Sequence, residues 1–402
     1  MLLFCMVVSI IKDMNDNQIK HQVETIESFN GIGGEGYMLS KELMTYFNEE
    51  TKFEDLGNEQ LIIQNEVYGR VIGAAINQDK MIEFSCELSR NLLEMDVYKA
   101  SVVANFIGFA CEKNEDTSAG KGVVDLLIKA CGLVEEFFGY FADEEGEVEL
   151  PENLDFAKMY EENSQCVRAY YGFNTLCVAA MAFLARDNEC REYLRSFEGI
   201  KDSLYFLAME APQTPYTKSV FYINRVFDTC GKLPLLVLDI ERKQGFFAEA
   251  KDIDNCFHLL FLLEEEMCGK VANAYGMENW EFDEDLSALA HGEYPQCGDK
   301  SYTTCFTELN YGEYIWKKQN AGKEDVNTNE WLNFLIWGEM SHLNIQDLDG
   351  YAVIMIERNG PSRSFSPGFL CVGHTALQPY VKIERALSEQ EYEEWLSKLD
   401  SL

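Results

Sequence analysis

The sequence predicts a mainly α-helical protein, in which stacked antiparallel helices form an irregular, solenoid-like domain followed by a small α+β module at the C-terminal end. Three observations predict this. Apolar residues recur at helical spacing from about residue 37 to residue 232, short polar turns join the helices, and strand-like segments follow Pro234. We therefore predict an N-terminal segment (1–36), a helical repeat-like domain (37–232) and a mixed module (233–402).

The first eleven residues, MLLFCMVVSII, are apolar throughout. They lack a basic start and a small-residue cleavage site, and they are too short to span a bilayer. They fit a first strand or helix placed in the core. Alternatively, Met14 is the native start and residues 1–13 are a misread extension.

The stretch GIGGEG at residues 31–36 fits the pattern G-x-G-x-x-G. A dinucleotide site requires a strand that runs directly into these glycines. The preceding QVETIESFN is polar and reads as a helix or loop, so we interpret the glycines as a flexible connection and predict no cofactor.

In three long runs of residues, apolar side chains recur at helical spacing. In the first, Val103, Phe106, Ile107 and Ala110 follow the spacing i, i+3, i+4 and i+7 of one helix face. The runs are DVYKASVVANFIGFACEK (96–113), GKGVVDLLIKACGLVEEFFGYF (120–141) and GFNTLCVAAMAFLARDNECREYL (172–194).

Parts of these runs, ANFIGFACEKNEDTSAGKGVVDLLIKAC and VAAMAFLARDNECREYL, resemble armadillo or HEAT-type helical repeats within residues 96–200. The shared pattern is a small-apolar helix, a polar turn with Asn and Glu, and a second apolar helix. The resemblance implies stacked helices and protein binding. The asparagine of the armadillo peptide groove falls at Gly108 and Phe183 here, so a groove of that type is not implied.

After Pro234, LLVLDI and FFAEA read as two strands joined by a turn at Gly245. Asp254 is the predicted N-cap of the helix NCFHLLFLLEEEM. YAVIMIE and YVKIE read as further strands, and a capping box of Ser388 and Glu391 predicts the last helix.

The charge balance is strongly acidic, with 69 acidic and 33 basic residues and a formal net charge of -36. Such a field repels nucleic-acid phosphates and anionic membranes, so we predict neither as a partner. Two acidic runs stand out, at 135–162 and 261–286. They are read either as solvated faces that confer solubility or as a docking surface for a basic protein.

The thirteen cysteines occur singly, without any C-x-x-C pair. This usage is typical of a reduced cytoplasm, where most of the thiols behave as small buried hydrophobes.

Candidate catalytic residues are few. His258 lies among leucines and is interpreted as a satisfied, partly buried residue. Cys305 with His342, or Cys371 with His374, would be the thiol–base pairs, although nothing local supports either.

Zinc ligands are equally scarce. The residues His291, Cys297 and Cys305 match no common zinc module. We predict no catalytic residue and no metal.

The most site-like region is residues 331–369, where aromatic residues and scarce positive charge gather. Trp and Arg are favoured at interface hot spots. An apolar contact between the helical part and the strands is the alternative interpretation. The predicted binding residues are Trp331, Trp337, His342, Arg358 and Arg363.

The leading hypothesis is therefore a cytoplasmic, acidic protein-interaction protein, such as a scaffold or an inhibitor of the immunity type, without an identifiable catalytic motif. The competing hypothesis is an enzyme of unknown class with a site between the helical domain and the C-terminal module. Such an enzyme would contain a concave pocket with converging polar groups and a titratable residue whose pKa is strongly shifted.

Overall fold

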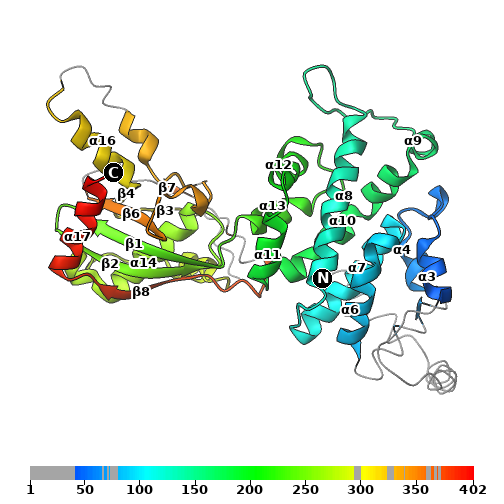
Figure 1. Ribbon diagram of the computed structural model, residues 1–402, viewed down its shortest axis with the longest axis horizontal. Helices are drawn as coiled ribbons and strands as arrows, with labels where there is room; N and C mark the ends of the chain where they lie inside the picture. Colours follow the sequence, from blue (N-terminus) through cyan, green and yellow to red (C-terminus); the bar gives the residue numbers. More distant parts are fainter. Residues whose placement is uncertain are drawn as a thin grey trace. The chain divides into compact units, whose positions relative to one another are not determined.

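The computed structural model describes residues 41–65, 68–69, 72, 80–293, 300–323, 330–338, 340–358, 364–365, 369 and 373–402. The chain divides into two compact units, residues 1–227 (unit 1) and residues 228–402 (unit 2), each of which is considered by itself (Figure 1). The glycine motif at 31–36 and the apolar segment 1–11 lie outside the described residues.

Within its described residues unit 1 is entirely helical, apart from turns and one isolated β-bridge, and unit 2 combines helices with a mixed sheet. The prediction of a helix-rich part followed by a small α+β part is confirmed. The elements of unit 1 are α3 (Lys41–Asn48), η2 (Phe53–Asp55), α4 (Glu59–Ile63), α6 (Met81–Asn91), η3 (Leu92–Glu94), α7 (Val97–Asn114), α8 (Gly120–Gly139), α9 (Phe156–Glu162), α10 (Ser164–Leu184), α11 (Asn188–Arg195), α12 (Ile200–Tyr205), the π-helical turn η4 (Phe206–Glu210) and α13 (Val220–Phe227).

The helix predicted for residues 96–113 is α7, and its predicted apolar face is buried apart from the half-buried Phe106. The run at 172–194 contains parts of two helices, α10 and α11, which are separated by a turn at residues 185–187, next to the Asn and Glu of the expected polar turn. The Asp187 carboxylate accepts the backbone N–H of Glu189 at 2.8 Å and so caps a new helix, α11.

Helix α10 lies at the centre of unit 1 and packs against α7, α8, α9 and α13. Small residues let α7 and α10 approach closely: a Cβ built on Gly108 would lie 3.1 Å from the Cα and the carbonyl oxygen of Ala179. Backbone cannot move away as a side-chain end can, so Gly108 is required by this contact.

We expect Gly108→Val to lower the free energy of unfolding of unit 1 by about 1–3 kcal/mol, because the new methyl groups would overpack the α7–α10 contact. Urea unfolding followed by far-UV circular dichroism measures this. The matched control is Gly132→Val in α8, where an added Cβ meets nothing within 4 Å. Because Val has a higher helix propensity than Gly, the control should lose no stability, and an equal loss in both variants would contradict the packing explanation.

Unit 2 is built on a sheet with the strand order β4-β6-β1-β2-β8, in which β1 and β6 are parallel and the other pairs antiparallel. Strand β5 pairs with β6 outside this order, and β3 pairs with β7 separately. The elements are β1 (Lys232–Asp239), β2 (Gln244–Lys251), α14 (Cys256–Tyr275), α15 (Glu284–Ala290), β3 (Tyr302–Thr303), β4 (Thr307–Leu309), α16 (Tyr311–Asn320), η5 (Glu330–Phe334), η6 (His342–Asn344), β5 (Asp347–Leu348), β6 (Tyr351–Glu357), β7 (Ser364–Phe365), β8 (Tyr380–Ala386) and α17 (Glu389–Asp400).

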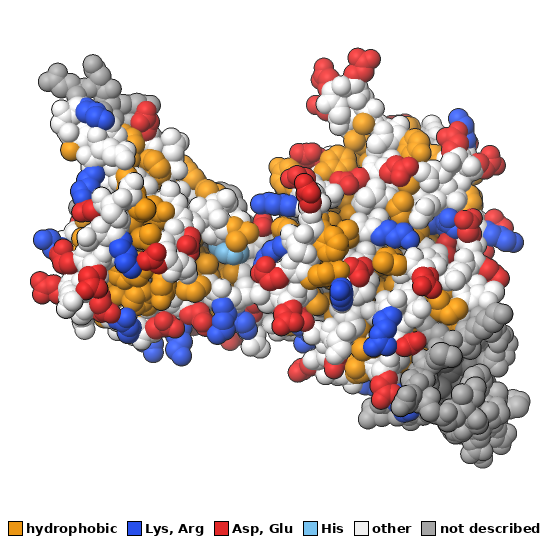
Figure 2. All heavy atoms as spheres, in the orientation of Figure 1, with side chains coloured by type: hydrophobic (Ala, Val, Ile, Leu, Met, Phe, Trp, Pro, Cys, Tyr) orange, Lys and Arg blue, Asp and Glu red, His pale blue; other side chains and the backbone are white. Residues whose placement is uncertain are grey.

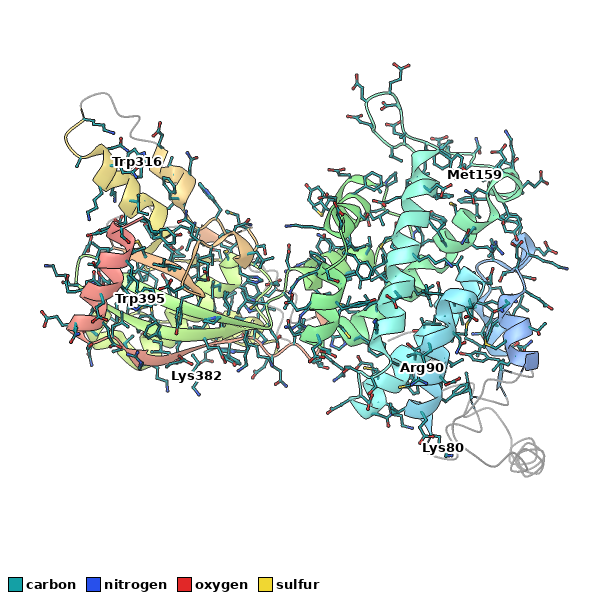
Figure 3. The ribbon with its side chains drawn as sticks, in the orientation of Figure 1. Lys80, Arg90, Met159, Trp316, Lys382 and Trp395 are labelled. Atoms are coloured by element: carbon teal, nitrogen blue, oxygen red, sulfur yellow. The ribbon has the colours of Figure 1, made fainter. Side chains whose placement is uncertain are left out.

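The two faces of this sheet are covered by different helices. Leu238, Leu309 and Met355 point to the face where Trp395 of α17 packs (Figure 3). Alternate residues point to the opposite face, where Phe246 meets Tyr275 of α14 with ring centroids 5.6 Å apart. Glu308, the neighbour of Leu309, therefore faces the α14 side.

Two details of the predicted module are wrong. The turn between β1 and β2 is residues 240–243, with Lys243 left-handed at φ 52°, and Gly245 lies inside β2. The N-cap of α14 is Asn255, whose side chain accepts the backbone N–H of His258, and not Asp254. The capping box of Ser388 and Glu391 at the start of α17 is confirmed.

Strand β8 is the last strand in the sheet order, and several of its features disfavour pairing with a strand of another molecule. The backbone N–H of Ile383 donates to the Glu266 carboxylate of α14 at 3.0 Å, and Lys382 is exposed (Figure 3). A register shift interrupts the β2–β8 pairing as well. Charges and bulges of this kind keep sheet edges from associating.

Candidate functional site

The predicted binding residues of unit 2 have different surroundings. Trp337 is 44% exposed, His342 is buried in η6, and Arg358 follows β6 with its guanidinium over the Phe306 ring at 5.4 Å. The Trp331 side chain and all of Arg363 lie outside the described residues.

Trp337 is held in place by the start of α14. The carbonyl oxygens of Gly338 and Met340 accept the backbone N–H groups of Phe257 and Cys256 at 2.9 and 3.0 Å. These N–H groups lie in the first turn of α14, where a helix offers them no acceptor of its own. A Cβ on Gly338 would lie 1.9 Å from the Phe257 ring, so this loop rests directly on the helix.

The densest group of ionisable side chains in unit 2 surrounds Glu264 of α14. Its carboxylate accepts the backbone N–H of Cys305 at 2.8 Å and that of Phe306 at 2.9 Å, and it also accepts the Tyr302 hydroxyl. Glu308 of β4 is a second buried carboxyl that acts on the pKa of Glu264. Burial raises the pKa of Glu264, and these hydrogen bonds oppose the shift only in part.

This carboxyl pair is closed to solvent, since Glu264 is 1% and Glu308 0% exposed. A substrate therefore has no access to either carboxyl in this conformation. The hydrogen bonds of the Glu264 carboxylate join α14 to the segment that contains Tyr302, Cys305 and Phe306.

The thiol–base pair of Cys305 and His342 has no support in the geometry. The groups that act on the Cys305 thiol are Glu264, Arg358, Glu308 and Cys268. Burial, followed by Glu264, raises the pKa of Cys305 to about 11, so little of the nucleophilic thiolate is present at neutral pH. Of the second pair, Cys371 lies outside the described residues.

His258 and His291 are held by local partners. The two ring nitrogens of His258 meet Asp254 at 3.0 Å and the carbonyl oxygen of Ala290 at 2.7 Å, so this residue is satisfied as predicted, although it is fully and not partly buried. His291 pairs with Glu265 at 2.7 Å. Among the described residues, no three His, Cys, Asp or Glu side chains gather as metal ligands; Cys297 lies outside them.

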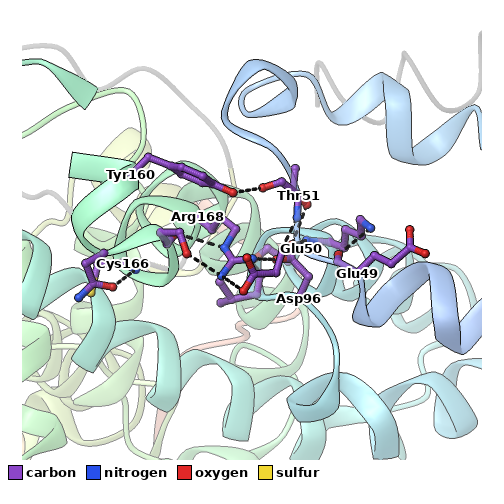
Figure 4. A network of polar contacts seen from close by, with 12 residues as sticks. Glu49, Glu50, Thr51, Asp96, Tyr160, Cys166 and Arg168 are labelled. Atoms are coloured by element: carbon purple, nitrogen blue, oxygen red, sulfur yellow. Dashed lines mark hydrogen bonds and ion pairs between the residues drawn. The ribbon is translucent and has the colours of Figure 1, made fainter. Parts of the chain in front are cut away.

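Unit 1 contains a second buried polar network, centred on Asp96 and Arg168 (Figure 4). Arg168 of α10 donates to Asp96 at 2.8 Å and to the exposed Glu50 at 3.1 Å. Asp96 also caps α7 through the backbone N–H of Lys99 and accepts the Thr51 hydroxyl at 2.8 Å. The network joins α7, α10 and the segment after α3, and its burial indicates a structural role.

The most exposed charged feature is the acidic hairpin, which we define as residues 142–149. It projects beyond α8, and its acidic side chains are visible at the tip in Figure 2. A β-bridge joins Ala142 to Val148, and the Asp143 carboxylate accepts the backbone N–H groups of Glu145 and Glu147 at 2.8 and 2.9 Å. These contacts give the hairpin a defined turn.

The carboxylates of the acidic hairpin have no ion-pair partner within the described chain. Elsewhere, bases such as Arg186, Lys300 and Lys398 pair with nearby acids. Five acidic side chains of the hairpin are exposed without such neutralisation: Asp143, Glu144, Glu145, Glu147 and Glu149.

Comparison with family models, with curated proteins and with solved structures gives no match to this chain. Nor is any helix of the described residues both long enough and apolar enough to cross a lipid bilayer. The functional argument therefore depends on the chain's own residues.

Proposed function

We propose that the protein binds a second protein with a basic surface and does so through the acidic hairpin. A cytoplasmic scaffold or an inhibitor of the immunity type is the form of function that we infer. The proposal includes the finer fold assignment, in which the helices of unit 1 stack as an irregular, armadillo- or HEAT-like solenoid. The packing of α10 on both α7 and α8 is consistent with such a stack.

The observation that carries the proposal is the unneutralised charge of the hairpin. About twice as many acidic as basic residues lie in each unit, and several of the bases pair with neighbouring acids outside the hairpin. The hairpin places five acidic side chains and no basic one on a single projecting turn. Such a field accelerates the encounter with a basic protein and disfavours acidic ones.

Two further features favour recognition over simple solubility. The turn is ordered by its own hydrogen bonds, so binding would cost little additional conformational entropy. Beside it, Tyr140 at the end of α8 is 52% exposed. An exposed tyrosine next to a charged turn offers the apolar contact that interface hot spots commonly require.

We expect the triple substitution Glu144→Gln, Glu145→Gln and Glu147→Gln to weaken binding of the basic partner about 10- to 100-fold at low salt. The estimate assumes about 0.5–1 kcal/mol for each exposed ion pair. Asp143 is retained because its side chain orders the turn. The wild-type and variant proteins would be used to capture partners from the source cell extract at low and moderate salt, with quantification by mass spectrometry.

The matched control removes the same charge from the second acidic run, by Glu278→Gln, Glu281→Gln and Glu284→Gln, all of them exposed. A stoichiometric basic protein that is retained by the wild type and by this control, and lost from the hairpin variant, supports the proposal. Equal capture by all three proteins would show that the hairpin does not bind. Capture that survives moderate salt unchanged would exclude a mainly electrostatic contact.

A further inference from the structure

We propose that a row of half-buried aromatic side chains beside the acidic hairpin binds arginine side chains of the basic partner. This inference rests on the proposed function, because it concerns the protein that the hairpin attracts, and it adds the chemistry of the contact. We define the aromatic row as five residues of unit 1, which are Phe53, Phe156, Tyr160, Tyr171 and Tyr216.

The five rings of the aromatic row follow one another along one surface. The ring centroid of Tyr171 lies 4.6 Å from that of Tyr216 and 5.6 Å from that of Phe156. Phe156 and Tyr160 are four residues apart on α9 and therefore lie on the same face of this helix. The Tyr160 ring centroid in turn lies 5.7 Å from that of Phe53. Side chains from η2, α9, α10 and the turn before α13 thus contribute to one surface.

The aromatic row rests on a buried layer that fixes its position. The rings of Phe137 in α8 and Tyr170 in α10 are buried and stack at 4.2 Å, and Phe156 stacks against them at 6.1 and 5.9 Å. The Tyr160 hydroxyl donates to the carbonyl oxygen of Thr51 at 2.5 Å (Figure 4). Rings that are already held in place lose little conformational freedom when a partner binds.

The aromatic row lies next to the base of the acidic hairpin, since α9 is close to the end of α8 from which the hairpin projects (Figure 1). Phe141, the residue before the hairpin, lies 5.6 Å from Phe137 between ring centroids, and Phe137 contacts Phe156 of the row. Just after α9, the side chain of Asn163 donates to the Tyr140 hydroxyl at 3.3 Å. One segment of a partner can therefore contact the hairpin and the row together.

The surroundings of the aromatic row are acidic. Glu54, Asp155 and Glu161 each adjoin one of its rings in sequence, are exposed, and have no ion-pair partner among the described residues. Two bases, Lys52 and Lys158, adjoin the row as well, and Lys158 pairs with an acid of its own helix at 3.7 Å. Ring faces and carboxylates both attract a positive charge, so the charge of this surface is complementary to a basic segment.

The chain's own cations lie over other aromatic rings. Lys99 lies 4.2 Å from the ring centroid of Tyr46, and Lys398 lies 3.9 Å from that of Trp395. Within the residues that the structure describes, no lysine or arginine lies over a ring of the aromatic row. Arginine fits these rings best, because its planar guanidinium stacks on an aromatic face while its N–H groups pair with a carboxylate.

The test measures binding of fluorescein-labelled hexa-arginine and hexa-lysine to the full chain by fluorescence anisotropy at low salt. The two peptides carry the same charge, so the ratio of their Kd values removes the effect of the overall acidic field. We expect the wild type to bind hexa-arginine more tightly. Tyr171→Leu combined with Tyr216→Leu should weaken hexa-arginine about 4- to 25-fold, which is about two- to fivefold for each ring, and should weaken hexa-lysine less. Equal binding of the two peptides by the wild type, or an unchanged Kd for hexa-arginine in the variant, would overturn the proposal.

A matched control and a second variant keep this test specific. Tyr222→Leu removes a 47% exposed ring of α13 outside the row and should leave the ratio of Kd values unchanged. An equal loss in this control would show that any exposed ring suffices and would refute the assignment to the row. If the double variant does not fold, Phe53→Leu at the end of the row replaces it, with an expected loss of about two- to fivefold for hexa-arginine.

The hairpin variant with three glutamates replaced separates this proposal from the proposed function. It keeps every ring of the aromatic row and should weaken both peptides alike. If it binds both peptides as the wild type does, while the ring variant loses hexa-arginine, the hairpin proposal fails and the aromatic row is supported. If the hairpin variant loses both peptides and the ring variant binds hexa-arginine as the wild type does, the aromatic row is refuted and the hairpin proposal is supported.

Discussion

Replacing Asp96 by Ala is expected to lower the free energy of unfolding of unit 1 by about 3–5 kcal/mol, because it leaves the buried guanidinium of Arg168 without its closest counter-charge. The same change removes the cap of α7 and the acceptor of the Thr51 hydroxyl. Arg168 keeps its contacts to Ser164 and to the exposed Glu50, which limits the loss.

The measurement exploits the uneven distribution of tryptophan. Because unit 1 contains no tryptophan, tryptophan fluorescence follows unit 2, whereas far-UV circular dichroism follows the helices of both units, so a change seen by dichroism alone reports on unit 1. We expect the dichroism transition of Asp96→Ala to move to lower urea and the fluorescence transition to stay in place. The control is Arg168→Met alone and together with Asp96→Ala. If the double variant is no more stable than Asp96→Ala, the unpaired charge is not the source of the loss.

The fold of unit 1 was predictable to the extent that local periodicity determines it. The face of α7 formed by Val103, Ile107 and Ala110 is buried as its spacing predicts. The break between α10 and α11 lies next to the polar Asn and Glu of the sequence pattern, and Asp187 caps α11 there. The order of packing around α10 depends on contacts between distant residues, and no local pattern contains these.

The binding residues proposed within 331–369 remain a prediction. Residues 331–369 were chosen for their aromatic and basic composition, yet His342 is buried and Trp337 is exposed on a separate loop. The two buried networks were missed, although each left a signal. Glu264 directly follows the apolar run CFHLLFLL, and Arg168 lies in the apolar stretch QCVRAYYGF, so each places a charge inside a helix face that should be buried. Their neighbours in space, Glu308 and Asp96, are distant in sequence, and a single sequence cannot reveal such neighbours.

The second large effect is expected for Glu264→Gln, which should lower the free energy of unfolding of unit 2 by about 2–4 kcal/mol. Both oxygens of Glu264 accept hydrogen bonds: Oε1 from Phe306, Oε2 from the Tyr302 hydroxyl, and both from the backbone N–H of Cys305. An amide offers one acceptor oxygen and turns its NH₂ group toward the remaining donors. At least one buried donor therefore loses its partner, and no solvent reaches the site to replace it.

Glu308→Gln is the matched comparison, because it makes the same chemical change on the other carboxyl of the pair. The donors that Glu264 accepts keep their acceptor in this variant, so we expect a smaller loss than for Glu264→Gln, within about 1 kcal/mol. Tryptophan fluorescence during urea unfolding at neutral pH compares the two variants. Equal losses would show that the removal of a buried carboxylate, and not the donors left without an acceptor, determines the cost.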